Sequence, residues 1–199
     1  MILNKKDYLR YVEADKKAMG NRKKSLLKDW VKRIFNWEKI LVEDYIITLR
    51  KLEYLHNIKK NPLQYLRYVI VFYRYRRKSV KLLINIPVNV AGPGLVIYHL
   101  GPITINRLVR IGSNCTLQPG VVIGQNRSEE NVPVIGNNVY FGPGAKVIGK
   151  VRVGNNVVIA PNSVVVKDVA DNCVVSGIPA QILKRIHGGG RLTVGAEGA

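Results

Sequence analysis

Of the three histidines in the chain, one has surroundings suited to proton transfer. His56 lies among helix-forming residues and His187 follows a basic pair near the C-terminus, so both are interpreted as structural or solvent-exposed. His99 lies in residues 95–102, at the start of a sequence repeat and just before a Gly-Pro pair. Because an imidazole accepts and releases a proton near neutral pH, His99 is the candidate general base.

Other motifs that carry chemistry are missing from the sequence. It has no GxxxxGK phosphate loop, no Cys/His metal cluster and no GxSxG nucleophile elbow. Two cysteines do not make a disulfide framework, and Cys115 falls at a position expected to be a buried core thiol. The sequence therefore predicts no metal site.

His99 precedes a repeat with a period of six, in which large apolar residues alternate with small or medium ones at a fixed phase. Such a period is typical of parallel β-helices, so the sequence predicts a prism of short strands joined by tight turns. A shift of two residues separates Ile97 and Ile103 from the later register. The large positions are Ile105, Ile111, Leu117, Ile123, Ile135, Phe141, Val147, Val153, Ile159 and Val165, and the small ones are Val109, Cys115, Val121, Val139, Ala145, Val151, Val157 and Ser163.

The corners of such a prism need residues that tolerate a positive φ, which are chiefly Gly and Asn. The pairs Asn137-Asn138 and Asn155-Asn156 recur after 18 residues, or three hexapeptides, as expected for one triangular turn. Continuing the count from Ile123 would point Glu129 inward, where an unpaired carboxylate is too costly. Residues 124–134 are therefore expected to form a loop that leaves the prism, a frequent place for function.

The N-terminal part is basic and has a different pattern. Residues 1–81 hold 22 Lys or Arg against 8 Asp or Glu, within a net charge of +19 for the chain. The spacing of Trp30, Ile34, Trp37 and Leu41 is typical of a helix, and Asn61-Pro62 predicts a cap and first turn of a helix through about Arg77. We expect a basic helical domain at 1–80, a β-helix domain at 81–187 and a flexible tail at 188–199.

The helix after Pro62 combines apolar and aromatic residues with a basic end, from Arg74 to Lys78. Its apolar stretch is shorter than the ~20 residues that span a bilayer. Two alternatives stay open, namely a helix on an anionic membrane surface and a helix that packs on other helices or on a neighbouring subunit. Nucleic acid is not expected as a partner, since no nucleic-acid-binding motif accompanies the charge.

Residues 84–183 resemble the hexapeptide-repeat acyltransferases, within them serine O-acetyltransferases and related acetyltransferases of surface polysaccharides. The segments that carry the resemblance are Ile97-Tyr98-His99, Gln118-Pro119-Gly120-Val121-Val122-Ile123-Gly124, residues 139–149 and Ser176-Gly177-Ile178-Pro179-Ala180. The resemblance implies a left-handed parallel β-helix, a homotrimer, and acetyl transfer from acetyl-CoA to a hydroxyl between subunits.

The same resemblance implies roles for individual residues. His99 would be the base, and glycine-rich coils would offer backbone N–H donors to the thioester oxygen. The coenzyme would run along a prism edge past Gly142, Gly144, Ala145 and Ala160, with Lys167 and Lys184 near its phosphates. The acceptor side would include Asn85, Tyr98, Glu129, Glu130 and Asn131.

The acceptor is where this chain departs from the serine enzymes. Those enzymes resemble Asp-His-Gly-Thr-Gly at the catalytic histidine, where this chain has Tyr98-His99-Leu100-Gly101-Pro102. Their second histidine aligns with the stretch that begins at Glu130, and an upstream aspartate aligns with Asn85. The charged groups that would hold the amine and carboxylate of serine are thus absent.

Three functions stay open from the sequence. The first is O-acetylation of a sugar in a capsular or other surface polysaccharide or lipid-linked glycan, the second is acetylation of serine or another small metabolite, and the third is a non-catalytic scaffold. The expected location is the cytoplasm, with the inner face of the membrane as an alternative, because the first residues lack the apolar region of a signal peptide.

Overall fold

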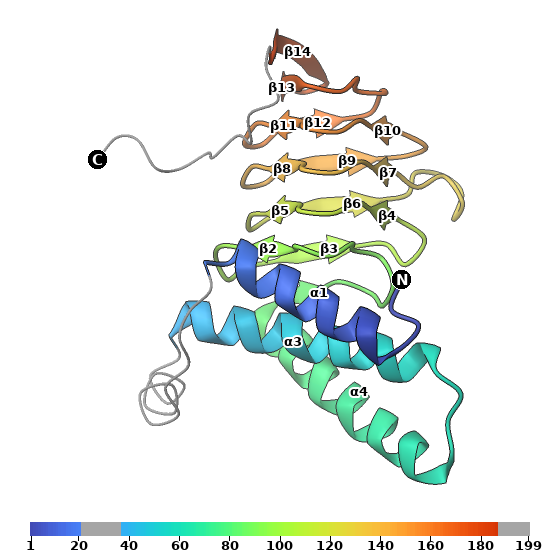
Figure 1. The fold of residues 1–199 in the computed structure, drawn as a ribbon. Helices are drawn as coiled ribbons and strands as arrows, with labels where there is room; N and C mark the ends of the chain where they lie inside the picture. Colours follow the sequence, from blue (N-terminus) through green and yellow to red (C-terminus); the bar gives the residue numbers. More distant parts are fainter. Residues whose placement is uncertain (21–36, 187–199) are drawn as a thin grey trace.

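The computed structural model describes residues 1–20 and 37–186. Helices at one end of the molecule are followed by short strands stacked into a prism (Figure 1). Trp30 and Ile34 of the predicted helical spacing, His187 and the tail at 188–199 lie outside the described residues.

The helices are α1 (Lys5–Ala18), α3 (Glu38–Asn57) and α4 (Pro62–Leu82), and an asparagine side chain caps the start of α1 and of α4. Asn4 caps α1 by accepting from the Asp7 amide at 2.9 Å. The predicted start of α4 is confirmed, since Asn61 and Gln64 form a reciprocal capping box. The helix runs on past the expected end at Arg77, because no Gly or Pro interrupts it before Leu83, which adopts a φ of 59°.

The strands are two to six residues long and form three sheets. The first sheet has the order β1-β3-β6-β9-β12, the second β10-β7-β4 and the third β14-β13-β11-β8-β5-β2. All pairs are parallel except the last, β13 with β14. Their bounds are β1 Ile84–Asn85, β2 Val96–Ile97, β3 Ile103–Ile105, β4 Arg110–Ile111, β5 Thr116–Leu117, β6 Val122–Gly124, β7 Val134–Ile135, β8 Tyr140–Phe141, β9 Lys146–Ile148, β10 Arg152–Val153, β11 Val158–Ile159, β12 Val164–Val165, β13 Cys173–Gly177 and β14 Ala180–Arg185.

The pairing register confirms the six-residue repeat and explains its two irregularities. Tyr140 pairs with Val158, 18 residues later, as expected for three hexapeptides. Thr116 pairs with Tyr140 after 24 residues, because the coil between them contains the predicted excursion loop. Val96 pairs with Thr116 after 20 residues, which is the two-residue shift seen in the sequence.

The prism interior is the apolar core that the repeat predicts. The ten large positions are all at most 5% exposed. The eight small positions are at most 3% exposed, and they include Cys115 at 1%. The corners of the prism also agree with the prediction, because Asn138 and Asn156 both have a φ of 55°. Their side chains form a hydrogen bond of 3.0 Å across adjoining coils. Stacked asparagine amides thus stabilise the turns from one coil to the next.

The excursion loop occupies the residues between β6 and β7, and Glu129 is exposed there as predicted. Its carboxylate accepts from the guanidinium of Arg107, which lies between β3 and β4 on the coil before the one that the loop leaves. The loop is therefore tethered to the prism by an exposed ion pair.

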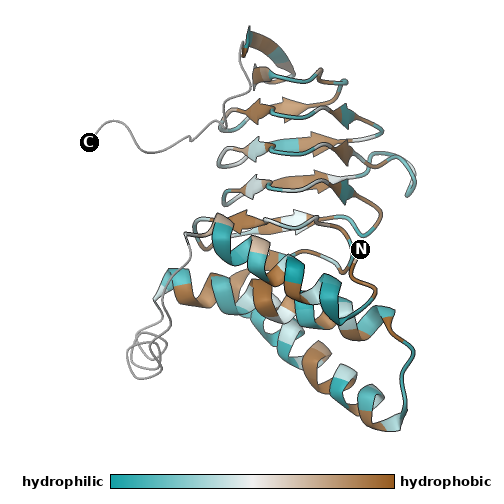
Figure 2. Ribbon diagram, viewed as in Figure 1, coloured by the Kyte–Doolittle hydropathy of each residue, from teal (hydrophilic) through white to brown (hydrophobic). Residues whose placement is uncertain are grey.

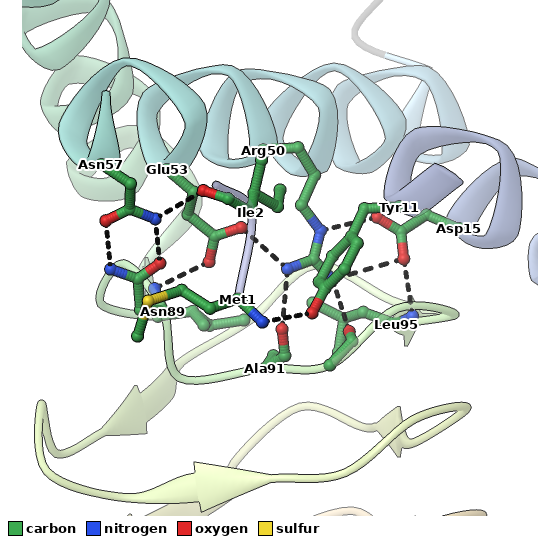
Figure 3. Close-up of polar contacts among 12 residues, drawn as sticks. Met1, Ile2, Tyr11, Asp15, Arg50, Glu53, Asn57, Asn89, Ala91 and Leu95 are labelled. Atoms are coloured by element: carbon green, nitrogen blue, oxygen red, sulfur yellow. Dashed lines mark hydrogen bonds and ion pairs between the residues drawn. The ribbon is translucent and has the colours of Figure 1, made fainter. Parts of the chain in front are cut away.

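A buried ionic network joins the helices to the first coil of the prism (Figure 3). Arg50 of α3 is 0% exposed and donates to Asp15 of α1 at 2.7 Å and to Glu53 at 3.0 Å. It also donates to the carbonyl of Ala91, while Asp15 accepts from the Leu95 amide at 2.8 Å. These contacts hold the segment that leads into β2 and then His99.

Candidate functional site

His99 lies two residues after β2, at the corner where the third sheet ends and the chain turns toward β3. Its side chain is 65% exposed, although Val96 and Ile97 just before it are buried. The imidazole is therefore on the outer surface of the prism and accessible to a substrate.

Glu38, the first residue of α3, is the group that contacts this imidazole. Its Oε2 lies 3.4 Å from His99 Nδ1, and its Oε1 accepts from the backbone amide of Leu100. A carboxylate at Nδ1 favours the tautomer that carries its proton there, which leaves Nε2 to accept a proton. The pair has the geometry of a base held by an orienting carboxylate.

Sequence reasoning missed Glu38 because 61 residues separate it from His99. The sequence did place an acidic residue just after Trp37 in a helix-like stretch, but this pattern also fits a carboxylate in the first turn of any helix. Only the packing of the helices against the prism brings the two side chains together.

The third sheet brings the candidate coenzyme residues to the same edge as His99. Ile97, Leu117, Phe141 and Ile159 are in register on β2, β5, β8 and β11. The residues that directly follow them therefore stack along one edge, and they are Tyr98, Gln118, Gly142 and Ala160. Of the site residues expected from the sequence, Tyr98, Gly142 and Ala160 thus share an edge with His99 on successive coils.

The glycines on this edge are required by close approach or by backbone conformation. A Cβ on Gly142 would lie 2.7 Å from the Pro161 nitrogen, and Gly144 has a φ of 71°. Gly142 and Ala145 are buried in the single chain, so Gly144 and Ala160 present more surface to a ligand. The N–H groups of Gly142 and Gly144 already donate, at 2.8 Å each, to carbonyls of adjoining coils. The expectation of free amide donors is therefore not met at these two glycines.

The two lysines expected near the coenzyme phosphates lie on different walls. Lys184 is exposed on β14, the last strand of the third sheet. Lys167 is exposed two residues after β12, which belongs to the first sheet. Within one protomer only Lys184 shares the wall of Gly142 and Ala160.

The candidate acceptor residues fall into two groups. Tyr98 is 51% exposed and adjoins His99. Asn85 is exposed on β1 in the first sheet and has no hydrogen bond to His99 among the contacts of the described residues. Glu129, Glu130 and Asn131 lie in the excursion loop, which leaves the prism after β6 of the first sheet. A single protomer therefore does not gather all five around His99.

The known proteins that resemble this chain are transferases of one kind. The profile described as "Bacterial transferase hexapeptide (six repeats)" matches residues 133–167. A serine acetyltransferase of Synechococcus elongatus is 38% identical over 96 residues, which cover 47% of this chain and 39% of that protein. A serine acetyltransferase of Buchnera aphidicola is 32% identical over 137 residues, which cover 67% of this chain and 50% of that protein. The chain thus spans half or less of the length of these curated relatives.

Solved structures give the same picture over most of the chain. A serine acetyltransferase from Neisseria gonorrhoeae has a TM-score of 0.65 at 25% identity and covers 91% of this chain and 67% of that one. The same enzyme in complex with serine has a TM-score of 0.64 at 26% identity, and the match covers 92% of this chain and 72% of that one. The predicted fold, a left-handed parallel β-helix preceded by helices, is confirmed by this likeness and by the three parallel sheets.

Proposed function

We propose that this chain, a hexapeptide-repeat protein that resembles serine acetyltransferases in sequence and fold, transfers an acetyl group from acetyl-CoA to a hydroxyl. The observation that supports the proposal best is the exposed His99 imidazole with Glu38 at its Nδ1, on the prism edge that also carries Gly142 and Ala160. A solved serine acetyltransferase from Brucella abortus with coenzyme A bound shares the fold, with a TM-score of 0.66, 23% identity, and coverage of 92% of this chain and 70% of that one.

The reaction needs a base because a hydroxyl is a weak nucleophile. As the hydroxyl oxygen attacks the thioester carbonyl carbon, His99 Nε2 takes its proton, and Glu38 stabilises the imidazolium that forms. The tetrahedral intermediate then collapses, the carbon–sulfur bond breaks, and the sulfur of coenzyme A leaves with the proton that His99 returns. The products are the acetyl ester and free coenzyme A, so atoms and charge balance.

A homotrimer is part of the proposal. Within one protomer the excursion loop and His99 lie at different corners of the prism, since His99 lies between the third and first sheets and the loop between the first and second. Packing three prisms side by side would set the loop of one subunit near the His99 edge of the next and close a cleft for the coenzyme. Glu129, Glu130 and Asn131 would then reach the acceptor from the neighbouring subunit.

Serine is the acceptor that the relatives favour, since both curated relatives and the gonococcal structures are named serine acetyltransferases. A sugar hydroxyl of a surface polysaccharide is the second candidate. One observation favours the sugar: the exposed Tyr98 stands next to His99 where the serine enzymes resemble Asp-His, and an aromatic ring suits a sugar face better than an ammonium and carboxylate pair.

Thiol release from acetyl-CoA tests the proposal. The chain would be incubated with acetyl-CoA and, in separate reactions, L-serine or de-O-acetylated polysaccharide. Both cysteines are buried, and burial raises the pKa of Cys115 to about 12, so the native protein should give little background with a thiol reagent. We expect release that depends on one acceptor class, and that class identifies the substrate. If no thiol is released with any acceptor, the proposed acetyltransferase activity is contradicted and the non-catalytic scaffold is the function that remains.

Replacing Glu38 with glutamine should lower kcat by about 10-fold, because the imidazole loses its carboxylate while the exposed contact limits the effect. The KM for acetyl-CoA should change little, since Glu38 contacts the base and Leu100. Steady-state kinetics would measure both values. Glu13→Gln on α1 is the control, since it removes one exposed carboxylate away from the site. An equal loss of kcat in the Glu38 and Glu13 variants would contradict a positioning role for Glu38.

A further inference from the structure

Helix α4 leaves most of its apolar side chains exposed. Its buried residues, Val71, Tyr75, Ser79 and Leu82, recur every three or four positions and form the one face that packs on the protein. Tyr68 is partly buried against the core, and the remaining apolar and aromatic residues are at least 44% exposed and project on the other sides. They are Leu63, Tyr65, Leu66, Val69, Ile70, Phe72, Tyr73 and Val80. Figure 2 shows hydrophobic and hydrophilic stretches alternating along α4, which lies at the end of the molecule away from the top of the prism.

The same exposed sides carry a strong positive charge. Between Pro62 and Leu82 the sequence has six Lys or Arg and no Asp or Glu. Arg67 and Arg74 are exposed and form no ion pair among residues 1–20 and 37–186. Arg77 lies over the Tyr73 ring, with its guanidinium carbon 5.9 Å from the ring centroid. Cations between aromatic and aliphatic side chains are typical of helices that lie in a membrane interface.

A groove beside this face has the chemistry of an anionic headgroup site. It has a volume of about 340 Å³ and lies where α1, α3 and α4 meet. Three cations, Lys51, Arg67 and Arg74, line it together with the rings of Tyr8 and Tyr54, which lie 5.6 Å apart. Ile70 lines the groove and also belongs to the exposed apolar face, so the two features are continuous.

A second copy packed on this face by its own α4 does not fit as well as an anionic surface does. Isologous packing through this face would bring the exposed basic residues of one α4, among them Arg67 and Arg74, against those of the other, and α4 has no acidic residue between them. An anionic bilayer supplies both the negative charge and an apolar layer for the exposed side chains. None of the described helices is long and apolar enough to cross a membrane, so α4 would lie on the surface.

We propose that the outward face of α4 and the Lys51–Arg67–Arg74 groove bind the surface of an anionic phospholipid bilayer. Leu66, Ile70 and Tyr73 enter the interface, and the groove holds a lipid phosphate. This binding is independent of whether His99 acts as a base, so either proposal can fail without the other.

Co-sedimentation of the full chain with vesicles tests the proposal. We expect the protein to pellet with phosphatidylglycerol vesicles, and not with vesicles of phosphatidylcholine alone, and to be released by added salt. Arg67→Gln with Arg74→Gln should weaken binding by about 30-fold, which corresponds to about 1 kcal/mol for each basic residue. Leu66→Ser with Ile70→Ser should also weaken it, through the loss of apolar contact.

The matched control is Lys150→Gln with Arg152→Gln, two exposed residues of the prism that remove the same charge. It should bind like the wild type, and all variants should keep the wild-type thermal unfolding midpoint because every altered side chain is exposed. Failure of the wild type to bind phosphatidylglycerol vesicles would overturn the proposal. Equal losses in the control and the Arg67/Arg74 variant would also overturn it, as would self-association in solution that the Leu66/Ile70 variant abolishes without any lipid binding.

Discussion

Replacing His99 with alanine is expected to lower kcat for acetyl transfer by about 10²–10⁴-fold, the usual contribution of a general base. The KM for acetyl-CoA should stay close to the wild-type value, because the coenzyme is expected to lie along the stacked coils and the imidazole acts only as the hydroxyl attacks. Steady-state kinetics with the better acceptor, followed by thiol release, would measure both constants.

His56→Ala is the matched control for this variant. His56 is exposed on α3, where its ring lies 6.1 Å from that of Tyr68, and it is far in sequence from the His99 corner. Its activity should equal that of the wild type. Wild-type kcat in the His99 variant, or an equal loss in the His56 variant, would contradict the role of His99 as base.

Replacing Arg50 with methionine is expected to destabilise the protein by about 3–5 kcal/mol, because it leaves two buried carboxylates without their cation. Arg50 is 0% exposed and Asp15 and Glu53 are each 1% exposed, so water cannot replace the lost contacts (Figure 3). Urea unfolding at a fixed protomer concentration would measure the free energy of unfolding. Arg10→Met is the control, since its pair with Asp7 is exposed and should contribute at most about 1 kcal/mol.

The loss of unfolding free energy in the Arg50→Met variant should grow as the pH rises. Burial raises the pKa of Glu53, and Arg50 opposes that effect. Without the guanidinium the pKa of Glu53 rises further, so the folded state keeps a proton that the unfolded chain releases. In the Arg50 variant, stability is therefore retained below the pKa that Glu53 has in the unfolded chain. It is lost as the pH rises through the higher pKa that Glu53 has in the folded protein. A deficit that is independent of pH would contradict a buried, charge-dependent network.

The prism was predictable because its repeat is local. Every sixth residue faces the interior, so the spacing of Leu117, Ile123 and Ile135 shows both the core and the place where a loop interrupts it. The Asn pairs mark corners because few other residues adopt a positive φ at low cost. The position of His99 on an outer corner follows from the same count.

The contacts between helices and prism were not predictable in this way. Glu38 meets His99 across 61 residues and Arg50 meets the carbonyl of Ala91 across 41, and neither spacing belongs to a repeat. The sequence also shows that α4 is apolar and basic, but it does not show that Val71 and Tyr75 face the core while Ile70 and Tyr73 face outward. Which side of α4 faces the core depends on how the helices pack against one another and against the prism.

The acceptor marks another limit of local reasoning. A sugar is favoured by the residues beside His99, whereas the similar proteins favour serine. Tyr98 and the loop residues Glu129 to Asn131 lie at different corners of one protomer's prism, so their combined chemistry depends on how subunits associate.

The distance from His99 Nε2 to the sulfur of coenzyme A, in a crystal structure of the chain with coenzyme A bound, tests the catalytic role most directly. We predict that the sulfur lies at the His99 corner, within roughly 6 Å of Nε2, so that an acceptor oxygen can lie between base and thioester. The adenine end would then extend along the edge past Gly144 and Ala160. A coenzyme bound on another wall, with its sulfur remote from His99, would contradict the assignment of this imidazole as the base.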